Sequence, residues 1–285
     1  MSSSRVKRLK TFVLMLLMML VVLGFSQYRH ILFCELVPYS SFHKLSDNIY
    51  VSPHIPTEHY FRIKLMLHVA DRRISRFWGE KKGNARIIIC SQAREYEKYC
   101  HSRDGAGCSL GAIYGNSFIV LSYQDMTTDV AAHEMCHIEL FERLGGKSTT
   151  FDIPQWFNEG LSMMLDHRFV RATDSISRYE QYLKAWQLRT VPPARRLTLT
   201  EISSLKGFFD GDERHVALAY LTAATEVSFW MKNVGRQGLA QFLKKIESGA
   251  GFEAYLQTEL EMTADSHGPR PVSPIRELEK QRPGG

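Results

Sequence analysis

One stretch of the chain, TTDVAAHEMCHIELFERLGG (Thr127–Gly146), restricts the fold more than any other part of the sequence. Polar residues suited to cap a helix open this stretch, and two glycines suited to end a helix close it. His133 and His137 lie four positions apart inside it, with Glu134 directly after the first histidine. Residues four apart on a helix stand above one another on one face. The stretch therefore predicts a helix that presents two metal-ligating imidazoles at a single position.

The H-E-x-x-H spacing suits a zinc ion that is used for hydrolysis. Imidazole nitrogens bind zinc at about 2.0–2.1 Å, and the pKa of a water molecule on the ion falls toward ~7. Glu134 is turned away from the ligand face by one residue, but its carboxylate can accept the proton of that water and pass it to a leaving amine. One helix supplies only two ligands in this way. A catalytic site therefore needs a third protein ligand from another element, with one position left open.

Glu159 is the candidate third ligand. It follows His137 by twenty-two positions, in the segment IPQWFNEGLSMML, where the residues around it are mostly apolar. A carboxylate that faces a hydrophobic core requires a partner, and a zinc ion is a sufficient one. The alternative is that Glu159 lies on the solvated face of its helix and takes no part in a metal site.

The two segments AAHEMCHIEL and PQWFNEGLSMML together resemble the gluzincin zinc peptidases, most closely the peptidase MA-like group. The resemblance extends from about Ile87 to Glu247. It implies a zinc ion on His133, His137 and Glu159, with Glu134 as the general base. It also implies a zincin-like fold, in which a twisted sheet lies above a helical lower half and the active-site cleft runs between them.

Two features depart from the gluzincin pattern or leave it incomplete. Thermolysin-type members place an acid four residues beyond the ligand glutamate to orient a histidine, whereas this chain has Met163 there. A backbone carbonyl or Asn158 is the alternative partner for a ligand histidine. These enzymes also use a tyrosine or histidine to stabilise the oxyanion, and here Tyr220 is the first candidate and His215 the second. A tyrosine on a helix is otherwise a packing residue.

The remaining patterns predict an α+β fold, with a small mixed sheet and the motif helix first and a mainly helical half afterwards. Helical spacing runs from Tyr60 to Gly79, and Pro154 opens the first of the later helices. The residues NSFIVLS, from Asn116 to Ser122, fit either an exposed strand that pairs with an extended substrate or a central strand. The predicted strands are NIYVS (48–52), ARIIIC (85–90) and the hairpin SLGAIYGNSFIVLSY (109–123), which turns at Gly115-Asn116.

The first residues have the pattern of a targeting segment. Four basic residues precede the uncharged run Thr11–Phe25, and apolar character resumes at Ile31–Val37. We expect an uncleaved signal anchor with its basic end in the cytoplasm and the rest of the chain outside it, in the periplasm or the extracellular space. Cleavage and secretion are the alternative. The predicted division is 1–37 for this segment, 38–260 for the metallopeptidase domain and 261–285 for a disordered, proline-rich tail.

The net charge of +6 carries little information about partners, because four of these charges precede the first apolar run. No long basic stripe remains, so nucleic acid is not an expected partner; the expected partners are a peptide or protein substrate and, through the N-terminal segment, the membrane. Outside the cytoplasm a disulfide is expected among Cys90, Cys100 and Cys108, with Cys100–Cys108 the first choice. Cys136, between the motif histidines, is expected to pack as a small buried residue.

The sequence thus supports a membrane-anchored zinc peptidase that cleaves extracytoplasmic proteins or peptides. A second hypothesis is a non-catalytic envelope protein that keeps the fold with a structural zinc ion or none, although a structural site has no need for Glu134. A fourth protein ligand would favour this second hypothesis, and the candidates are Cys136, His101 and His167. A third hypothesis is a chance motif in an unrelated helical protein.

Overall fold

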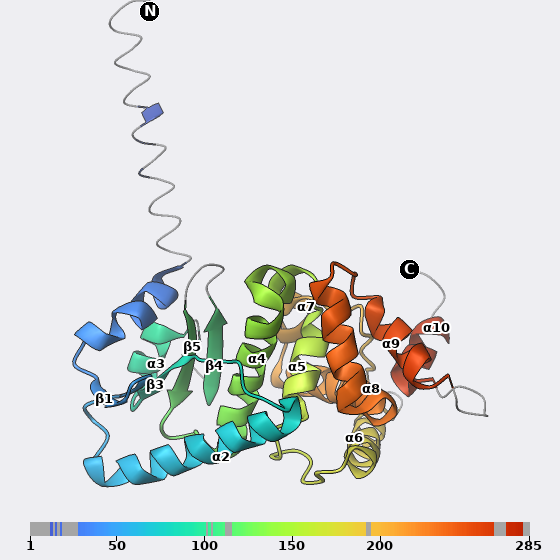
Figure 1. Ribbon diagram of the computed structural model, residues 1–285, viewed down its shortest axis with the longest axis horizontal. Coiled ribbons are helices and arrows are strands. Elements are labelled where there is room, and N and C mark those ends of the chain that lie inside the picture. The colour runs from blue at the N-terminus through green and yellow to red at the C-terminus, as the bar shows by residue number, and fades with distance from the viewer. Residues whose placement is uncertain are drawn as a thin grey trace, which may run out of the picture.

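The computed structural model describes residues 12, 13, 15, 18, 28–100, 102–103, 105–111, 116–191, 195–264 and 272–281. A five-stranded mixed sheet forms one half of the molecule and helices form the other half (Figure 1). The predicted α+β class is therefore confirmed.

The sheet has the strand order β1-β2-β3-β5-β4. β2, β3 and β5 run parallel, while β1 and β4 are antiparallel to their neighbours at the two edges. The run predicted as either an exposed or a central strand is β5, and it lies between β3 and β4. The strands are β1 (His43–Ser46), β2 (Ile49–Val51), β3 (Arg86–Cys90), β4 (Gly107–Gly111) and β5 (Ser117–Ser122).

Both faces of the central strands are buried, which explains why β3 and β5 read as continuous apolar runs. Ile87, Ile89 and Leu121 share one face and belong to the main hydrophobic core with α2 and α4. Ile88 and Val120 share the other face and belong to a smaller core with α3 and with the helical residues 28–36. Alternate residues of a strand point to opposite sides, so each strand contributes to both cores.

Helices α4 to α10 gather beside the β4 edge of the sheet, and α2 runs along the sheet and continues beneath α4 (Figure 1). The long helices are amphipathic or wholly buried, as the spacing of their apolar residues predicts. They are α2 (Tyr60–Trp78), α3 (Ala93–Tyr99), α4 (Thr128–Phe151), α5 (Gln155–Met163), α6 (Ser175–Arg189), α7 (Leu205–Phe209), α8 (Glu213–Glu247), α9 (Ala254–Met262) and α10 (Pro274–Gln281), with short 3₁₀ turns η1 (Val37–Tyr39) and η2 (Thr57–His59).

The predicted motif helix is confirmed as the first part of α4. The Thr127 side chain caps it by accepting a hydrogen bond from the backbone N–H of Val130. Gly145 interrupts the helix with a φ of 78°, a conformation that favours glycine, and helical residues continue beyond it as far as Phe151. Gly145 therefore ends the motif helix at the predicted position, and a second helical stretch follows it within α4.

The prediction of a membrane-anchored protein is wrong. Among the residues that the structure describes, no helix combines the length and the apolar character that crossing a membrane requires. Most of the run Thr11–Phe25 lies outside the described residues. The apolar residues that follow have another role, because Cys34 and Val37 are fully buried against the sheet in the smaller core.

The C-terminal region also differs from the prediction of a disordered tail at 261–285. α10 lies within that range and packs on the helical half, where Ile275 is fully buried. The Arg276 guanidinium lies 2.9 Å from the buried Glu226 carboxylate and 2.8 Å from that of Glu259. Polar composition suggested disorder here, but a single arginine between two carboxylates docks the segment. Both boundaries of the predicted 38–260 domain therefore leave out residues that pack on it.

The predicted disulfide is confirmed. Cys100, after α3, is bonded to Cys108 on β4, which ties the edge strand to the small core. Cys90 and Cys136 are free and buried, and Cys136 packs inside the main core as expected.

Candidate metal centre

The two predicted ligand segments lie side by side, with α4 between the sheet and α5. The residue after Glu159 explains the close packing of α5 on α8. A Cβ atom at Gly160 would lie 2.6 Å from the Ala223 carbonyl oxygen and 2.5 Å from Val227, so a larger residue would push the helices apart. The Glu-Gly pair therefore places a carboxylate on one face of α5 and allows close helix packing on another.

His133, His137 and Glu159 converge, and we call them the metal cluster. Oε2 of Glu159 lies 3.2 Å from Nε2 of His133 and 3.6 Å from Nε2 of His137. One potential ligand atom from each residue lies within 4.8 Å of the others. Glu159 is only 5% exposed, so the alternative in which it lies on a solvated face is wrong. A buried group of two imidazoles and one carboxylate could hold a metal ion.

In the metal cluster, the ionised carboxylate of Glu159 and the protonated imidazole of His137 stabilise each other. Burial lowers the pKa of His137, but the Glu159 carboxylate outweighs it and raises that pKa to about 9. Burial raises the pKa of Glu159, but His137 and His133 together hold it well below its usual range. The carboxylate is therefore ionised at neutral pH, and it attracts positive charge into the space between the three residues.

A buried carboxylate and an arginine lie behind His133. Asp166 is fully buried, and its Oδ2 lies 3.7 Å from Nδ1 of His133, a nitrogen that has no hydrogen-bond partner among the described residues. Arg168 donates from Nε to both oxygens of Asp166, at 3.0 and 2.9 Å. Burial raises the pKa of Asp166, but Arg168 outweighs it and keeps that pKa below its ordinary value. An ionised Asp166 favours a proton on Nδ1 of His133, which leaves Nε2 for the cluster.

Residues of α5 hold the other two members of the metal cluster. Nδ1 of His137 lies 2.8 Å from Oδ1 of Asn158 and 3.1 Å from the hydroxyl of Ser162. Asn158 is the partner for a ligand histidine that the sequence offered as an alternative to a backbone carbonyl. Nε2 of Gln155 donates a 2.7 Å hydrogen bond to Oε1 of Glu159. The Asn158 contact favours a proton on Nδ1 of His137, so its Nε2 also faces the cluster.

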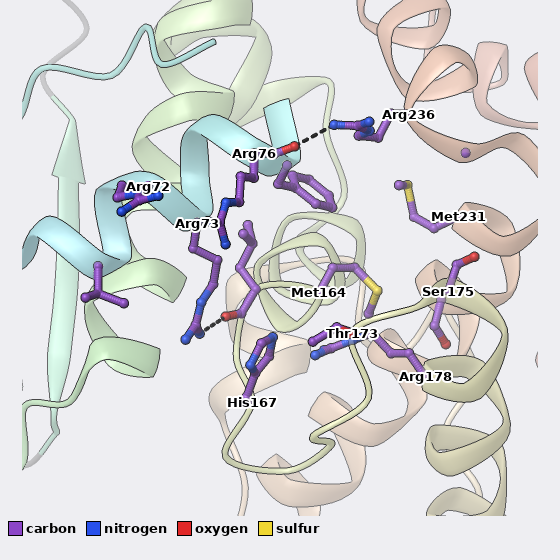
Figure 2. A pocket seen from close by; sticks show the side chains of 15 residues that line it. Arg72, Arg73, Arg76, Met164, His167, Thr173, Ser175, Arg178, Met231 and Arg236 are labelled. Carbon is purple, nitrogen blue, oxygen red and sulfur yellow. Dashed lines mark hydrogen bonds between the residues drawn. The ribbon is translucent and has the colours of Figure 1, made fainter. Parts of the chain in front are cut away.

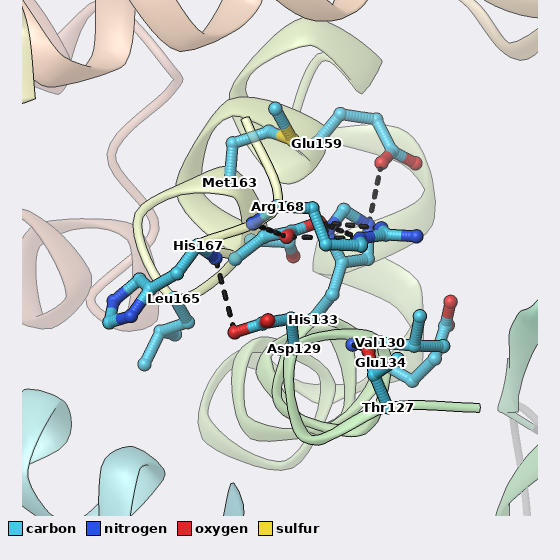
Figure 3. Close-up of polar contacts among 12 residues, drawn as sticks. Thr127, Asp129, Val130, His133, Glu134, Glu159, Met163, Leu165, His167 and Arg168 are labelled. Atoms are coloured by element: carbon cyan, nitrogen blue, oxygen red, sulfur yellow. Dashed lines mark hydrogen bonds and ion pairs between the residues drawn. The ribbon is translucent and has the colours of Figure 1, made fainter. Parts of the chain in front are cut away.

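Glu134 lies on the side of α4 that faces the edge strand β4. The Ser109 hydroxyl donates a 2.7 Å hydrogen bond to Oε2 of Glu134. A Cβ atom at Gly107 would lie 2.9 Å from Cγ of Glu134, so the absence of a side chain there gives this glutamate its room. Figure 3 shows Glu134 beside His133 on α4, and Glu134 is not among the residues whose potential ligand atoms converge, as expected for a residue that is not a ligand.

The structure separates the two candidates for oxyanion stabilisation. The ring of Tyr220 lies 6.3 Å from that of His133 and packs edge-on against Phe208. Burial raises the pKa of Tyr220 well above its ordinary value, and the charges of Glu159 and Glu134 raise it further, so the phenol keeps its proton. His215 instead bonds to the Gly207 carbonyl oxygen at 2.9 Å and lines another cavity. Tyr220 is therefore near the metal cluster, whereas the ring of His215 is held by a backbone carbonyl at another cavity.

No fourth protein ligand joins the metal cluster among the residues that the structure describes. Cys136 is packed in the core, and His167 points away from His133 (Figure 3). His101 lies outside the described residues.

Five residues around the site were not predicted from the sequence: Ser109, Gln155, Ser162, Asp166 and Arg168. Gln155 precedes Glu159 by four positions, which places both on one helix face and could have been noticed. Asp166 and Arg168 follow α5, close to Met163, which occupies the position of the acid in the gluzincin pattern. Because they lie in a loop, helical spacing could not predict that they reach His133. Ser109 reaches Glu134 only through the pairing of β4 with β5, which a local pattern cannot reveal.

A scan against known protein families found no match for this chain, and a search of curated proteins found no similar sequence.

Proposed function

We propose that this protein is a zinc-dependent peptidase in which His133, His137 and Glu159 hold the ion and Glu134 is the general base. The observation that carries this proposal is the convergence of one carboxylate and two imidazoles beside a glutamate that is not a ligand. A purely structural zinc site has no use for such a glutamate, and it normally has four protein ligands.

The spacing of the cluster atoms supports zinc as the ion. Two ligands at about 2.1 Å from a tetrahedral ion lie roughly 3.4 Å apart. The two distances to Oε2 of Glu159, 3.2 and 3.6 Å, bracket that value. Two nitrogens and one oxygen form a donor set that suits zinc better than calcium or magnesium, which prefer oxygen ligands alone.

The chain's own residues then have distinct roles. A zinc ion bound there would activate a water molecule and polarise the scissile carbonyl. Glu134 accepts the proton of the attacking water and delivers it to the leaving amine. Tyr220, kept protonated by burial, donates a hydrogen bond to the oxygen that becomes negatively charged. Asp166 and Asn158 hold the two imidazoles in the orientation that binding requires.

The edge strand β4 is the proposed site of substrate pairing. β5 pairs with it on one side only, and on the other side its backbone groups have no strand partner among the described residues. An extended peptide can add to such an edge through main-chain hydrogen bonds, which fits a peptide or protein as the substrate. Ser109 contacts Glu134 from this strand, so a peptide paired here would lie close to the base.

Zinc content and peptide cleavage, measured on the same samples, test the proposal. The wild-type protein is expected to hold one zinc ion per chain by atomic absorption and to cleave a library of unstructured peptides. Glu134→Gln is expected to keep the zinc and to lose about 10²–10⁴-fold in cleavage rate, because a general base contributes about that much.

Glu142→Gln is the matched control, since it makes the same change at an exposed position of the same helix. It should behave like the wild type. A protein that holds zinc and cleaves no peptide in the library would refute the peptidase proposal and favour a structural site. A protein that binds no zinc would refute both.

A further inference from the structure

A separate cavity of about 670 Å³ lies between α2, the chain that follows α5, and α8 (Figure 2). Pockets for small molecules have volumes of about 300–1,000 Å³, so this one has the size of a ligand site. The residues that line it include none of the metal cluster. We call it the arginine cavity, because five arginines line it: Arg72, Arg73, Arg76, Arg178 and Arg236.

Apolar side chains form much of the lining. Phe77 comes from α2, Met164 and Leu165 follow α5, and Met231 comes from α8. Leu165 and Met231 are buried in the main core, so the cavity reaches the hydrophobic interior of the protein. Methionine side chains are flexible and adapt to ligands of irregular shape. Such a surface favours a ligand with a substantial apolar part.

Three arginines at this cavity have no carboxylate partner in the part of the chain that the structure describes. Arg72 and Arg76 are exposed and form no ion pair there. Arg236 reaches across from α8 and donates a 2.6 Å hydrogen bond to the backbone oxygen of Arg76 (Figure 2). This contact joins the C-terminal end of α2 to the interior of α8, beside the kink at Gly235, and it neutralises none of the three charges.

The other two arginines add one more uncompensated charge. Arg73 is paired with Asp129 and also donates to the Leu165 carbonyl oxygen. Arg178 is only 4% exposed, and it donates to the backbone oxygens of Met163, Asp166, Val170 and Ala172. No aspartate or glutamate lines the cavity among the described residues. The cavity is therefore strongly positive, and a bound anion would reduce the repulsion among its arginines.

We propose that the arginine cavity binds a small amphiphile with one anionic headgroup, a carboxylate or a phosphate, on an apolar chain. The guanidinium groups of Arg72, Arg76 and Arg236 bind the headgroup, because their planar donors match two oxygens of either anion. The apolar chain lies against Phe77, Met164 and Met231.

The arginine cavity and the metal cluster are separated by residues 164–168. Leu165 and His167 line the cavity, while Asp166 and Arg168 bond to each other behind His133. A metal ion and an anionic amphiphile would thus occupy different sites. Binding of the amphiphile does not depend on the peptidase proposal.

Isothermal titration calorimetry of the full chain tests the proposal with four probes below their micelle concentrations: decanoate, decyl phosphate, decyltrimethylammonium and inorganic phosphate. We expect one site per chain for at least one of the two anionic amphiphiles, and the tighter of the two identifies the headgroup. The cationic amphiphile and inorganic phosphate should bind at least tenfold more weakly.

Charge reversal localises the site. Arg72→Glu combined with Arg76→Glu should weaken the anionic amphiphile at least tenfold, and both positions are exposed, so the fold should persist. Arg62→Glu combined with Lys64→Glu makes the same charge change on exposed positions of α2 outside the cavity and should leave binding within twofold. Equal binding of the cationic probe, equal binding of inorganic phosphate, or equal loss in both double variants would overturn the proposal.

Discussion

The metal cluster and the arginine cavity adjoin the same segment, residues 164–168, but their charges are arranged in opposite ways. Around the metal cluster, three carboxylates of Glu134, Glu159 and Asp166 surround two imidazoles, so the site attracts a cation. Five arginines line the cavity, and no carboxylate does so in the described part of the chain, so that site attracts an anion. Alternate residues of one short segment thus serve two chemically opposite sites.

The comparison also shows how differently the two sites depend on the sequence. The metal cluster comes from two helices whose ligands follow a spacing rule. The arginine cavity comes from three separate segments, and each of its arginines alone reads as an ordinary solvated charge. Four experiments test this contrast between the two sites.

Loss of the ligand carboxylate should have the largest effect. Glu159→Ala is expected to weaken zinc binding by more than about a hundredfold, the upper end of what changing an outer partner of a metal ligand costs. The variant also leaves His137 without the charge that raises its pKa. Competition with a chromogenic chelator measures the zinc affinity. Decanoate or decyl phosphate binding should not change, and a parallel loss of both would show that the variant has unfolded.

Asp166→Asn should reduce zinc affinity about 10–100-fold. The neutral amide lacks the negative charge with which the Asp166 carboxylate orients the imidazole of His133. The same change removes the charge partner of Arg168, so the unfolding temperature should be measured alongside. Arg168→Gln separates the two effects, since it keeps the carboxylate. If Asp166→Asn bound zinc as tightly as the wild type, Asp166 would have no role in orienting His133.

Zinc affinity should rise with pH by about tenfold per unit between pH 7 and 8 and level off above about 9. The pKa of His137 is about 9 in the absence of metal, so one proton must leave before its nitrogen can bind the ion. The same raised pKa stabilises the metal-free fold below the ordinary histidine pKa, and this stabilisation is lost as the pH rises through about 9.

Proton release measured by calorimetry in buffers of different ionisation enthalpy checks this prediction. Anionic amphiphile binding at the arginine cavity should be nearly constant over the same range, because guanidinium groups stay charged. Zinc affinity that did not change with pH would contradict the proposed coupling of His137 and Glu159.

Arg73→Ala should have the smallest effect, a loss of about 1 kcal/mol in the free energy of unfolding. Arg73 joins Asp129 of the motif helix to the Leu165 backbone, but the pair is partly exposed and such pairs contribute little. Urea denaturation measures the change, with Arg72→Ala as the control, because Arg72 makes no such contacts with the residues that the structure describes. A loss above about 3 kcal/mol would mean that this contact holds the shared segment in place.

Much of the site could be predicted because helices convert spacing into geometry. His133 and His137 had to share a face, and a glutamate among apolar residues had to find a partner. The outer residues could not be predicted in the same way, because Asp166 lies in a loop and Ser109 reaches Glu134 from a strand. Their positions depend on how the sheet packs against α4.

The fold shows the same division between local and distant causes. The central strands and long helices follow from apolar runs and periodicity. The packing of the N-terminal and C-terminal segments does not follow from their hydrophobicity or polarity alone, because it depends on partners elsewhere in the chain. Cys34 and Val37 pack on a sheet, and Arg276 binds two buried carboxylates that lie far from it in the sequence.

The most direct test of the central claim is the coordination of zinc in a crystal of the metal-loaded protein, located by anomalous scattering at the zinc edge. We predict one ion, about 2.0–2.1 Å from a nitrogen of His133 and of His137 and about 2.0–2.2 Å from an oxygen of Glu159, with no other protein atom bound. An ion held by a fourth protein ligand, or placed away from Glu159, would contradict this prediction.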